Sequence, residues 1–501
     1  MTGPRRDRHH DRVNGAKDHE LLRALADAVV DQDPARVAPV TARLASLSGP
    51  GWLRLDELAR AWKYTRQAPL DEVADWRPLL AVGNDAVHLA AASMYRDGRV
   101  REAAVRALDR TAGPVAAAAL AVRVADWVPE IGSAASAALA ARTEPEDVAA
   151  IISVLLALRQ RRRGERTAAG YLAAIAAGPA ATLEALAVPG ERARRLWALA
   201  ALASRGLLSP AALAERAKRD PDPVVALWCA RSLAGPDGEL PPGIGAQLLE
   251  SGRAGVRAFA AGHVSADELT RQRLGSLLLD HSGAVRSIAR WRWRRDHGSA
   301  APVYRAALTS ADRPGRIAAG LQGLSEDHDG SLPAAAVPFL THRSPAVRRA
   351  AAQAIGQRAD EAELLRHLVP LLLDDSGKVA AVALRHIRGQ AVPAGLLTTL
   401  DAAGTVRARR MALSIRQRSG TWNRVHADLA ALGGGDPDLV EAGRRDLLSW
   451  LQHGAATSYG RPSAVQAAEI AGLLATGRLS QQQRREIAFV AGVRLPANAR
   501  E

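Results

Sequence analysis

A tryptophan flanked by arginines, near the middle of the chain, is the clearest group of side chains that could contact a partner. Arg286, Arg290 and Arg294 are spaced four residues apart, so on a helix they share one face. Trp291 follows Arg290, and Arg295 comes four residues after Trp291. Guanidinium groups pair with carboxylates and phosphates, and an indole can stack on a base or fill an apolar pocket. These five residues are candidates for binding an acidic partner.

A second basic segment, 402–427, contains several arginines and no acidic residue. Its candidate contact residues are Arg407, Arg410 and Trp422. The alternative for both segments is an arginine-rich solvated surface whose charges pair with acids on neighbouring helices and contribute little.

Sequence motifs for catalysis are missing. The chain has no GxGxxG after a strand, no GxxxxGK[ST], no HExxH, no CxxC and no GxSxG. The pair His9-His10 lies in a polar terminal segment, and Gly433 to Gly435 is best explained as a flexible linker before a helix. We therefore expect no catalytic residue, no metal site, no cofactor and no enzyme activity.

The elements that position the candidate residues follow an internal repeat. The pattern is Val, then Arg at +1, Ala at +4 and +7, and Leu or Ile at +8, and it recurs about every 31 residues. It is clear at Val100, Val285 and Val347. Weaker copies start at Ile131, Ala193, Val225, Val256, Arg316, Val379 and Val406, and one obscured copy is expected near Arg162.

Offsets 0, +4, +7 and +8 share one face of an α-helix, so this face should be buried. Another apolar helix precedes each copy, and the pair can bury its apolar face only by stacking on the next pair. Pro210, Pro223, Pro345 and Pro437 mark expected helix starts. The predicted core residues are Val100, Ala104, Trp197, Trp228, Val285, Ala289, Trp293, Val347, Ala351 and Ile355. Trp291 occupies offset +6, so we expect it to be exposed.

This D/SPxVRxxAxxAL pattern resembles the HEAT repeats, specifically the short bacterial type also called PBS-lyase HEAT-like. The resemblance covers roughly 85–415. It implies an all-α fold, an α-solenoid or superhelix of stacked antiparallel helix pairs, whose second helices line a concave face. It also implies a ladder between the Arg at +1 and the preceding Asp, as in Arg286 with Asp280. The other ladder arginines would be Arg101, Arg257, Arg348 and Arg407, with interruptions at Gly132, Ala226, Ile317 and Ala380.

Four regions are expected along the chain: a disordered polar tail at 1–17, a helical cap region at 18–84, the repeat solenoid at 85–430 and a C-terminal helical cap at 436–501. The 501 residues carry a net charge of +15, and almost all the cations are arginine. A GC-rich genome is the simpler explanation of that bias. The single Cys229, the polar N-terminus and the shortness of the apolar run 148–158 favour a reducing cytoplasm and no membrane segment.

The leading functional hypothesis is a non-catalytic scaffold that binds a protein partner through its concave face. The alternative is nucleic-acid binding, as the resemblance to HEAT-like alkylpurine DNA glycosylases implies, although no catalytic Asp with flanking tryptophans can be matched. A tetrapyrrole lyase is supported only by the family's name. The oligomeric state stays open.

Overall fold

The computed structural model describes residues 5–31, 33–60, 69–73, 76, 80, 85–159, 161, 165–309, 313–327, 332–387, 394–476 and 478–495. Every regular element in these ranges is an α-helix or a short 3-10 helix. The chain divides into two compact units, Met1–His263 and Val264–Glu501, which we call unit 1 and unit 2.

Unit 1 begins with α1 (Arg5–Asp31), α2 (Pro34–Ala45), α3 (Gly49–Arg60) and η1 (Pro69–Glu72). The helices of its repeats are α5 (Ala86–Ser93), α6 (Gly98–Asp109), α7 (Pro114–Arg123), α8 (Pro129–Ala140), α9 (Pro145–Leu158), α10 (Glu165–Ala177), α11 (Ala180–Leu186), α12 (Arg192–Ser204), α13 (Pro210–Arg219), α14 (Pro223–Arg231), α15 (Ile244–Leu249) and α16 (Ala254–His263).

Unit 2 contains α17 (Arg271–Leu278), α18 (Gly283–His297), α19 (Ala301–Leu308), α20 (Pro314–Glu326), α21 (Leu332–Ala336), η2 (Val337–Thr341), α22 (Pro345–Arg358), α23 (Glu361–Leu368), η3 (Pro370–Leu373), α24 (Gly377–Ile387), α25 (Ala394–Ala402) and α26 (Val406–Arg416). It ends with α27 (Thr421–Gly433), α28 (Pro437–His453), η4 (Ala455–Thr457), α29 (Ala464–Thr476) and α30 (Gln481–Ala491).

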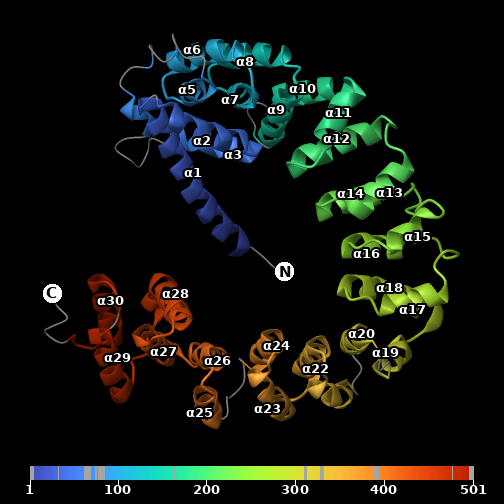
Figure 1. Ribbon diagram of the computed structural model, residues 1–501, viewed down its shortest axis with the longest axis vertical. Coiled ribbons are helices and arrows are strands. Elements are labelled where there is room, and N and C mark those ends of the chain that lie inside the picture. The colour runs from blue at the N-terminus through green and yellow to red at the C-terminus, as the bar shows by residue number, and fades with distance from the viewer. Residues whose placement is uncertain are drawn as a thin grey trace. The chain divides into compact units, whose positions relative to one another are not determined.

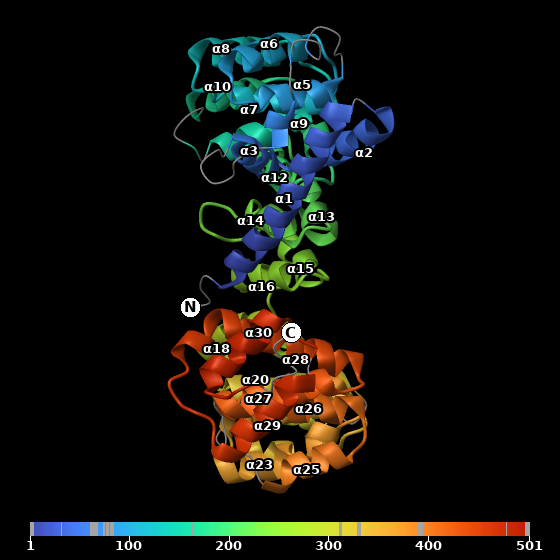
Figure 2. The same cartoon turned by 90° about the vertical axis from the view of Figure 1, so that its left-hand side faces the viewer.

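Consecutive helices form pairs, and the pairs stack on one another. In unit 2, α18, α20, α22, α24 and α26 form one row, and each contacts the next (Figure 1). Figure 2 shows the same arrangement in unit 1, where α6 lies beside α8 and α5 beside α7. The helices α18, α20, α22, α24 and α26 begin 29 to 32 residues apart. Within each unit, the predicted fold of stacked helix pairs is confirmed.

Proline fixes the start of many of these helices. Pro210, Pro223, Pro345 and Pro437 are the first residues of α13, α14, α22 and α28, as predicted. Proline suits this position because its missing N–H would have no partner in the first turn. In α28 the preceding Asp436 also accepts hydrogen bonds from the first-turn N–H groups.

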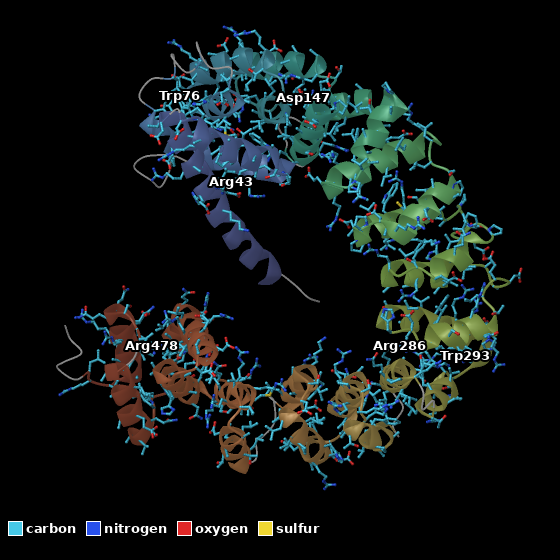
Figure 3. All side chains as sticks on the ribbon, in the orientation of Figure 1. Arg43, Trp76, Asp147, Arg286, Trp293 and Arg478 are labelled. Atoms are coloured by element: carbon cyan, nitrogen blue, oxygen red, sulfur yellow. The ribbon has the colours of Figure 1, made fainter. Side chains whose placement is uncertain are left out.

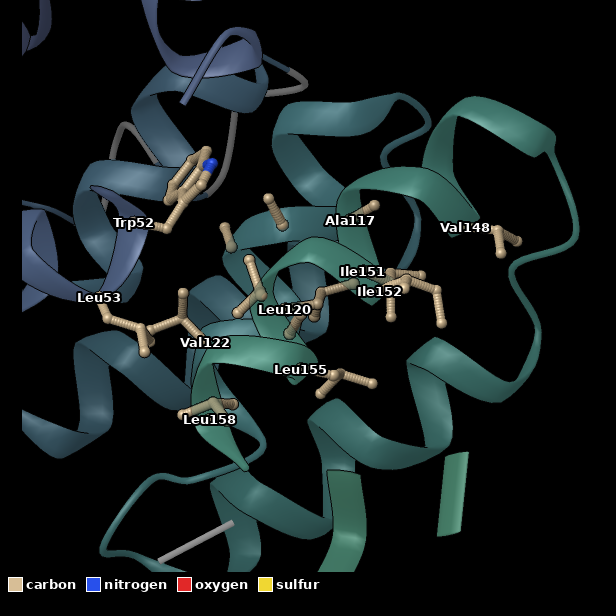
Figure 4. Packing of buried hydrophobic residues seen from close by; sticks show 14 of the residues in the cluster. Trp52, Leu53, Ala117, Leu120, Val122, Val148, Ile151, Ile152, Leu155 and Leu158 are labelled. Atoms are coloured by element: carbon tan, nitrogen blue, oxygen red, sulfur yellow. The ribbon is translucent and has the colours of Figure 1, made fainter. Parts of the chain in front are cut away.

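Small and branched apolar residues build the core between the stacked helices. In unit 1, Ile151, Ile152 and Leu155 of α9 belong to one buried cluster with Leu120 of α7 and Trp52 of α3 (Figure 4). These helices come very close, since a Cβ on Gly49 of α3 would overlap the backbone of α9. Close approach with interdigitated side chains is the packing expected of interiors rich in alanine and branched aliphatic residues.

Buried arginines recur at one position of the second helices. Each donates a hydrogen bond from its guanidinium to the backbone carbonyl six residues earlier, in the turn that precedes its own helix. The donor and acceptor pairs are Arg101 with Tyr95 (3.2 Å), Arg257 with Ser251 (2.7 Å), Arg286 with Asp280 (2.8 Å) and Arg348 with His342 (2.9 Å). The Arg286–Asp280 contact predicted for the ladder is therefore made through the backbone oxygen of Asp280.

Several arginines at this position also hold a carboxylate farther along the chain. Arg101 contacts Asp126 at 3.0 Å, and Arg348 contacts Asp374 at 2.7 Å. Arg195 pairs in the same way with Asp220. Hydrogen bonds from Arg348 lower the pKa of Asp374 below its ordinary value. Each of these buried cations is thus neutralised by the next repeat, which is what makes its burial tolerable.

Other arginines reach back to carbonyl oxygens of the previous repeat. The donor and acceptor pairs are Arg142 with Leu108 (2.6 Å) and Thr111 (2.7 Å), Arg205 with Gly178 (2.7 Å), Arg358 with Ser325 (2.8 Å) and Arg407 with Asp374 (3.0 Å) and Asp375 (2.7 Å). Arg407, which we expected to be a ladder arginine, belongs to this group. Arginine therefore bridges repeats in both directions.

The register of two repeats differs from the sequence pattern. In α12 the buried ladder arginine is Arg195, so the repeat starts at Arg194 and not at Ala193. In α26 the buried residues begin at Ala408, whereas Val406, the predicted start, is 42% exposed. Both errors arise because several alanines and arginines at adjacent positions fit the pattern in more than one way.

The expected regional boundaries are only partly visible in the structure. Helix α1 runs through residue 17, where we had placed the end of a disordered tail. The division at His263 and Val264 falls inside the range 85–430 that we had treated as one solenoid. Arg162 lies outside the described residues. Among the described residues, no single helix is long and apolar enough to cross a membrane, although the bent pair α10 and α11 passes by length and composition.

We predict that Val347→Asp disrupts unit 2, because Val347 is fully buried at the start of α22 and an unpaired carboxylate there has no solvent. The expected loss of stability is on the order of 3 kcal/mol or more, measured by urea unfolding. Val465→Asp is the control, since Val465 is 69% exposed. Equal unfolding midpoints for the two variants would contradict the stacking register.

Candidate partner-binding surface

Helix α18 carries the aromatic and basic residues that the sequence singled out. Val285 and Ala289 are fully buried, and Trp293 is 5% exposed. The indole N–H of Trp293 donates to the carbonyl of Ser299 at 3.3 Å (Figure 3 labels Trp293 and Arg286). This face of α18 is fixed by the stack, so the opposite face is held rigidly toward solvent.

Trp291 lies on that opposite face and is 61% exposed. Its repeat position, offset +6, is taken in the following second helices by Gln322, Gln353 and Arg385. Gln322 and Gln353 are partly exposed, and Arg385 is exposed. Trp291 is thus a large apolar side chain at a position where the following repeats have polar ones. Its exposure contributes nothing to the packed core.

The arginine stripe beside Trp291 is already paired within the molecule. Arg290 contacts Glu326 at 3.0 Å, and Arg286 also pairs with Glu326. Arg294 pairs with Asp327. Both acids lie at the end of α20, so the stripe binds the next repeat. Our expectation that Arg286 and Arg290 face a partner is therefore corrected: their side chains are only 3% and 12% exposed.

Two arginines remain beside Trp291 on the solvent side of α18. The side chains of Arg294 and Arg295 are 55% and 54% exposed. Arg295 contacts the adjacent Asp296 at 2.9 Å, a surface pair worth little energy. The candidate contact surface on α18 therefore consists of Trp291, Arg294 and Arg295.

The basic segment 402–427 is balanced by acids from outside it. Arg410 lies 3.2 Å from Asp438, Arg424 lies 2.6 Å from Asp446, and Arg416 pairs with Asp401. The segment lacks acids in the sequence, but α25 and α28 supply them in space. Arg407 and Arg410 lie on α26, four helix pairs after α18, so they do not share a site with Trp291.

Trp422, predicted to contact a partner, is instead buried. Its side chain is 7% exposed, and its indole N–H donates to the carbonyl of Gly460 at 2.8 Å. Its ring meets Trp450 edge-on, with 6.1 Å between ring centroids. Helix α27 is covered by α28 and α29, which the prediction from the basic segment alone did not include.

The sequence did not reveal a groove beside α26. It has a volume of about 900 Å³ and is lined by Val406, Arg409, Asp436 and Leu439, among others. Arg409 and Asp436 lie 3.6 Å apart, at the position of the ladder pairs elsewhere. The exposed Val406 was the available signal, but the pattern placed it in the core.

The predicted core tryptophans of unit 1 are only partly buried. Trp197 and Trp228 pack against the apolar core, as does Val100, while Ala104 is fully buried. In unit 2, Val347, Ala351 and Ile355 are fully buried. Trp127, which the sequence did not single out, is 63% exposed. The Cζ atom of the buried Arg101 lies over its indole ring, 5.7 Å from the ring centroid.

Side chains suited to binding a metal ion do not gather in the described residues. No three His, Cys, Asp or Glu side chains there could hold a metal ion. Burial raises the pKa of the Cys229 thiol to about 11, so it stays protonated at neutral pH.

No family model and no curated protein matches the chain. Similar solved structures include yeast importin-β (Kap95p), with 11% identity, 94% of this chain and 67% of that chain covered, and a TM-score of 0.39. Kap95p with RanGDP matches at 12% identity, 95% and 66% coverage, and a TM-score of 0.32. Kap121p matches at 12% identity, with 95% of this chain and 54% of that chain covered and a TM-score of 0.24. Similarities this low carry no inference about family, partner or activity.

One buried acid near Trp422 makes stability depend on pH. Asp428 is 0% exposed, and one carboxyl oxygen accepts a hydrogen bond from Gln417 at 2.7 Å. The other oxygen has no hydrogen-bond partner among the described residues. Burial raises the pKa of Asp428 to about 8, with a further contribution from the charge of Asp446. At neutral pH the side chain is therefore mostly protonated.

We predict that Asp428→Asn stabilises unit 2 at pH 8 by several kcal/mol, because the folded chain holds the pKa of Asp428 well above its ordinary value and one pKa unit corresponds to about 1.4 kcal/mol. Below the ordinary pKa of 3.8 the carboxyl is protonated in both the folded and the unfolded chain, so it does not reduce the free energy of unfolding. As the pH rises toward 8, only the unfolded chain releases it, and stability falls. Asparagine is neutral throughout and should remove this fall.

The measurement is the free energy of unfolding between pH 4 and pH 9. Asp438→Asn is the matched control, because the Asp438 side chain is 67% exposed. A variant at Asp428 that lost as much stability with rising pH as the wild type would show that Asp428 is ionised in the folded chain.

Proposed function

We propose that this protein is a non-catalytic scaffold that binds a protein partner through the face of the second helices of unit 2, centred on Trp291. The observation that carries the proposal is the 61% exposure of Trp291 on a helix whose opposite face is locked in the core. Tryptophan and arginine are the residues that most often dominate protein interfaces.

The surroundings of Trp291 fit an interface centre. Arg294 and Arg295 flank it with more than half of each side chain exposed. The buried anchors Val285, Ala289 and Trp293 fix the backbone, so binding would cost little conformational entropy. A partner that presents an apolar pocket edged by carboxylates would match this combination.

Pairing within the protein favours a protein partner over nucleic acid. Arg286 and Arg290 are held by Glu326, and Arg424 by Asp446. A phosphate backbone would have to displace these carboxylates or be repelled by their negative charge. For nucleic-acid binding, only arginines with exposed side chains, such as Arg294 and Arg295, could reach a phosphate without breaking a buried ion pair.

We predict that Trp291→Ala combined with Arg295→Glu weakens partner binding at least about thirtyfold, because truncation of a central tryptophan removes 2 kcal/mol or more. The measurement is quantitative affinity capture from the source cells, with thermal unfolding to verify the fold. Arg295 is chosen because Arg290→Glu would place a carboxylate against Glu326 and disturb the stack.

The control is Phe489→Ala combined with Arg485→Glu in α30. Phe489 is 86% exposed and lies four residues from the exposed Arg485, so the pair has the same chemistry on another surface. Proteins captured by the wild type and by this control should be lost with the Trp291 variant. Capture of the same proteins by all three would refute the proposed surface.

The nucleic-acid alternative predicts a steep dependence of affinity on salt. Six to ten phosphate contacts would reduce the affinity for duplex or single-stranded DNA by about 10³ to 10⁵ between 50 and 200 mM salt. We expect no such binding at either concentration, measured by fluorescence anisotropy. Salt-sensitive binding that Arg295→Glu weakens would favour the alternative.

A further inference from the structure

Unit 1 contains an open groove that none of the candidate residues above touch. Its volume is about 640 Å³. Ala149 and Ala150 of α9, which we call its floor, line it together with the buried Trp52 of α3. One wall is the turn between α2 and α3, and the other is the turn between α11 and α12, which contributes Val188 and Arg194.

Arg194 occupies a position that six other second helices fill with a buried aliphatic residue. The third residue of the second helix is Ile131 in α8, Val225 in α14, Val256 in α16, Val285 in α18, Val347 in α22 and Val379 in α24, and each is at most 1% exposed. In α12 the third residue is Arg194. The neighbouring Arg195 takes the ladder position and pairs with Asp220, so Arg194 is not needed for the ladder.

The guanidinium of Arg194 has no hydrogen-bonded partner in the described part of the chain. No hydrogen bond or ion pair joins it to a described residue, and its Nε is completely buried. The side chain lies against Gly190, where a Cβ would come within 2.5 Å of its Nη2. Burial lowers the pKa of Arg194 somewhat, although arginine still stays charged at neutral pH. The nearby charge of Glu191 offsets part of this cost, but no hydrogen-bonded acid neutralises Arg194 as Asp220 neutralises Arg195.

Two glutamates also line the groove, but neither forms an ion pair with Arg194. Glu146 lies in the first turn of α9, and Glu191 is the residue that precedes α12. Acids at these positions are favoured by the positive end of the helix dipole. Their charge is thus partly offset by their own helices, whereas that of Arg194 is not met by a hydrogen-bonded acid.

The shape of the groove suits a peptide segment more than a small molecule. Ala45, Ser46, Pro145 and Val188 on its rim are all exposed, so the groove is a trough open along its length. Small-molecule sites usually enclose most of their ligand. An extended segment can instead place one side chain on the alanine floor and another on the wall.

We propose that this groove binds a segment of a partner protein that places a carboxylate on Arg194 and an apolar side chain on the floor formed by Ala149 and Ala150. Charge complementarity identifies the first contact, and the alanine floor with Val188 identifies the second. A carboxylate can accept two hydrogen bonds from one guanidinium, so the pair would be strong and directional. This site is separate from Trp291 and does not depend on the function proposed for unit 2.

The test selects phage-displayed random dodecapeptides on the full chain and compares the consensus peptide with its Asp→Asn or Glu→Gln form. We expect an acidic residue in the consensus, and a loss of affinity of at least about tenfold in Arg194→Val. Valine restores the residue found in other repeats, so the thermal stability of this variant should not fall. The amide peptide should bind the wild type and Arg194→Val equally weakly.

The matched control is Arg316→Val, because Arg316 is the third residue of α20, the same repeat position in unit 2, and does not line the groove. This control should bind the consensus peptide as the wild type does. A consensus without acidic residues, or peptides that bind Arg194→Val as tightly as the wild type, would overturn the proposal. Because the variants of the Trp291 surface lie in unit 2, the two proposals fail independently.

Discussion

The stacked helix pairs depend on the burial of guanidinium groups, and each such group must find both an anion and carbonyl acceptors. Arg101, Arg286 and Arg348 find a carbonyl oxygen in their own turn and a carboxylate farther along the chain. A planar group with five N–H donors can meet both demands at once, whereas a lysine ammonium cannot span them in the same way. The scarcity of lysine, which genome composition alone could explain, also has this structural reason.

The surfaces proposed for binding are places where this internal pairing stops. On α18, Arg286 and Arg290 are used by the stack, and Trp291 with Arg295 remains outside it. In α12, Arg195 is used by the stack and Arg194 is not. Net charge is therefore a poor guide to function in this chain, because many of its arginines are paired within the fold.

Much of the fold followed from the sequence, because a buried stripe at offsets 0, +4, +7 and +8 repeats with nearly constant spacing. The pattern correctly predicted helix starts at prolines such as Pro223 and Pro345. It failed where neighbouring positions were equally suitable, as at Ala193 and Val406. The α12 register is identified by the burial of Arg195 and by its pairing with Asp220, and that pair joins residues far apart in the sequence.

The candidate site was less predictable, because exposure depends on neighbouring helices. Trp291 is exposed, and its offset had predicted this, whereas Trp422 is covered by Trp450 and the loop at Gly460. The acids Glu326 and Asp438 lie 36 and 28 residues from their arginines Arg290 and Arg410, so inspection of local charge could not find them. The groove at Arg194 is formed by two separate turns and helix α9, so it has no local signature in the sequence.

The forward direction of the arginine contacts determines where the chain could be shortened. Arg348 in α22 takes its carboxylate from Asp374, which precedes α24, and α24 has Ala380 where α22 has the arginine. A fragment that ended after α22 would leave a cation at its new end without an acid. One that ended after α24 would keep the pair and finish on an apolar position that a designed polar cap could cover. The chain is therefore best shortened after helices that lack a ladder arginine. Recombinant fragments of this protein should end at those helices.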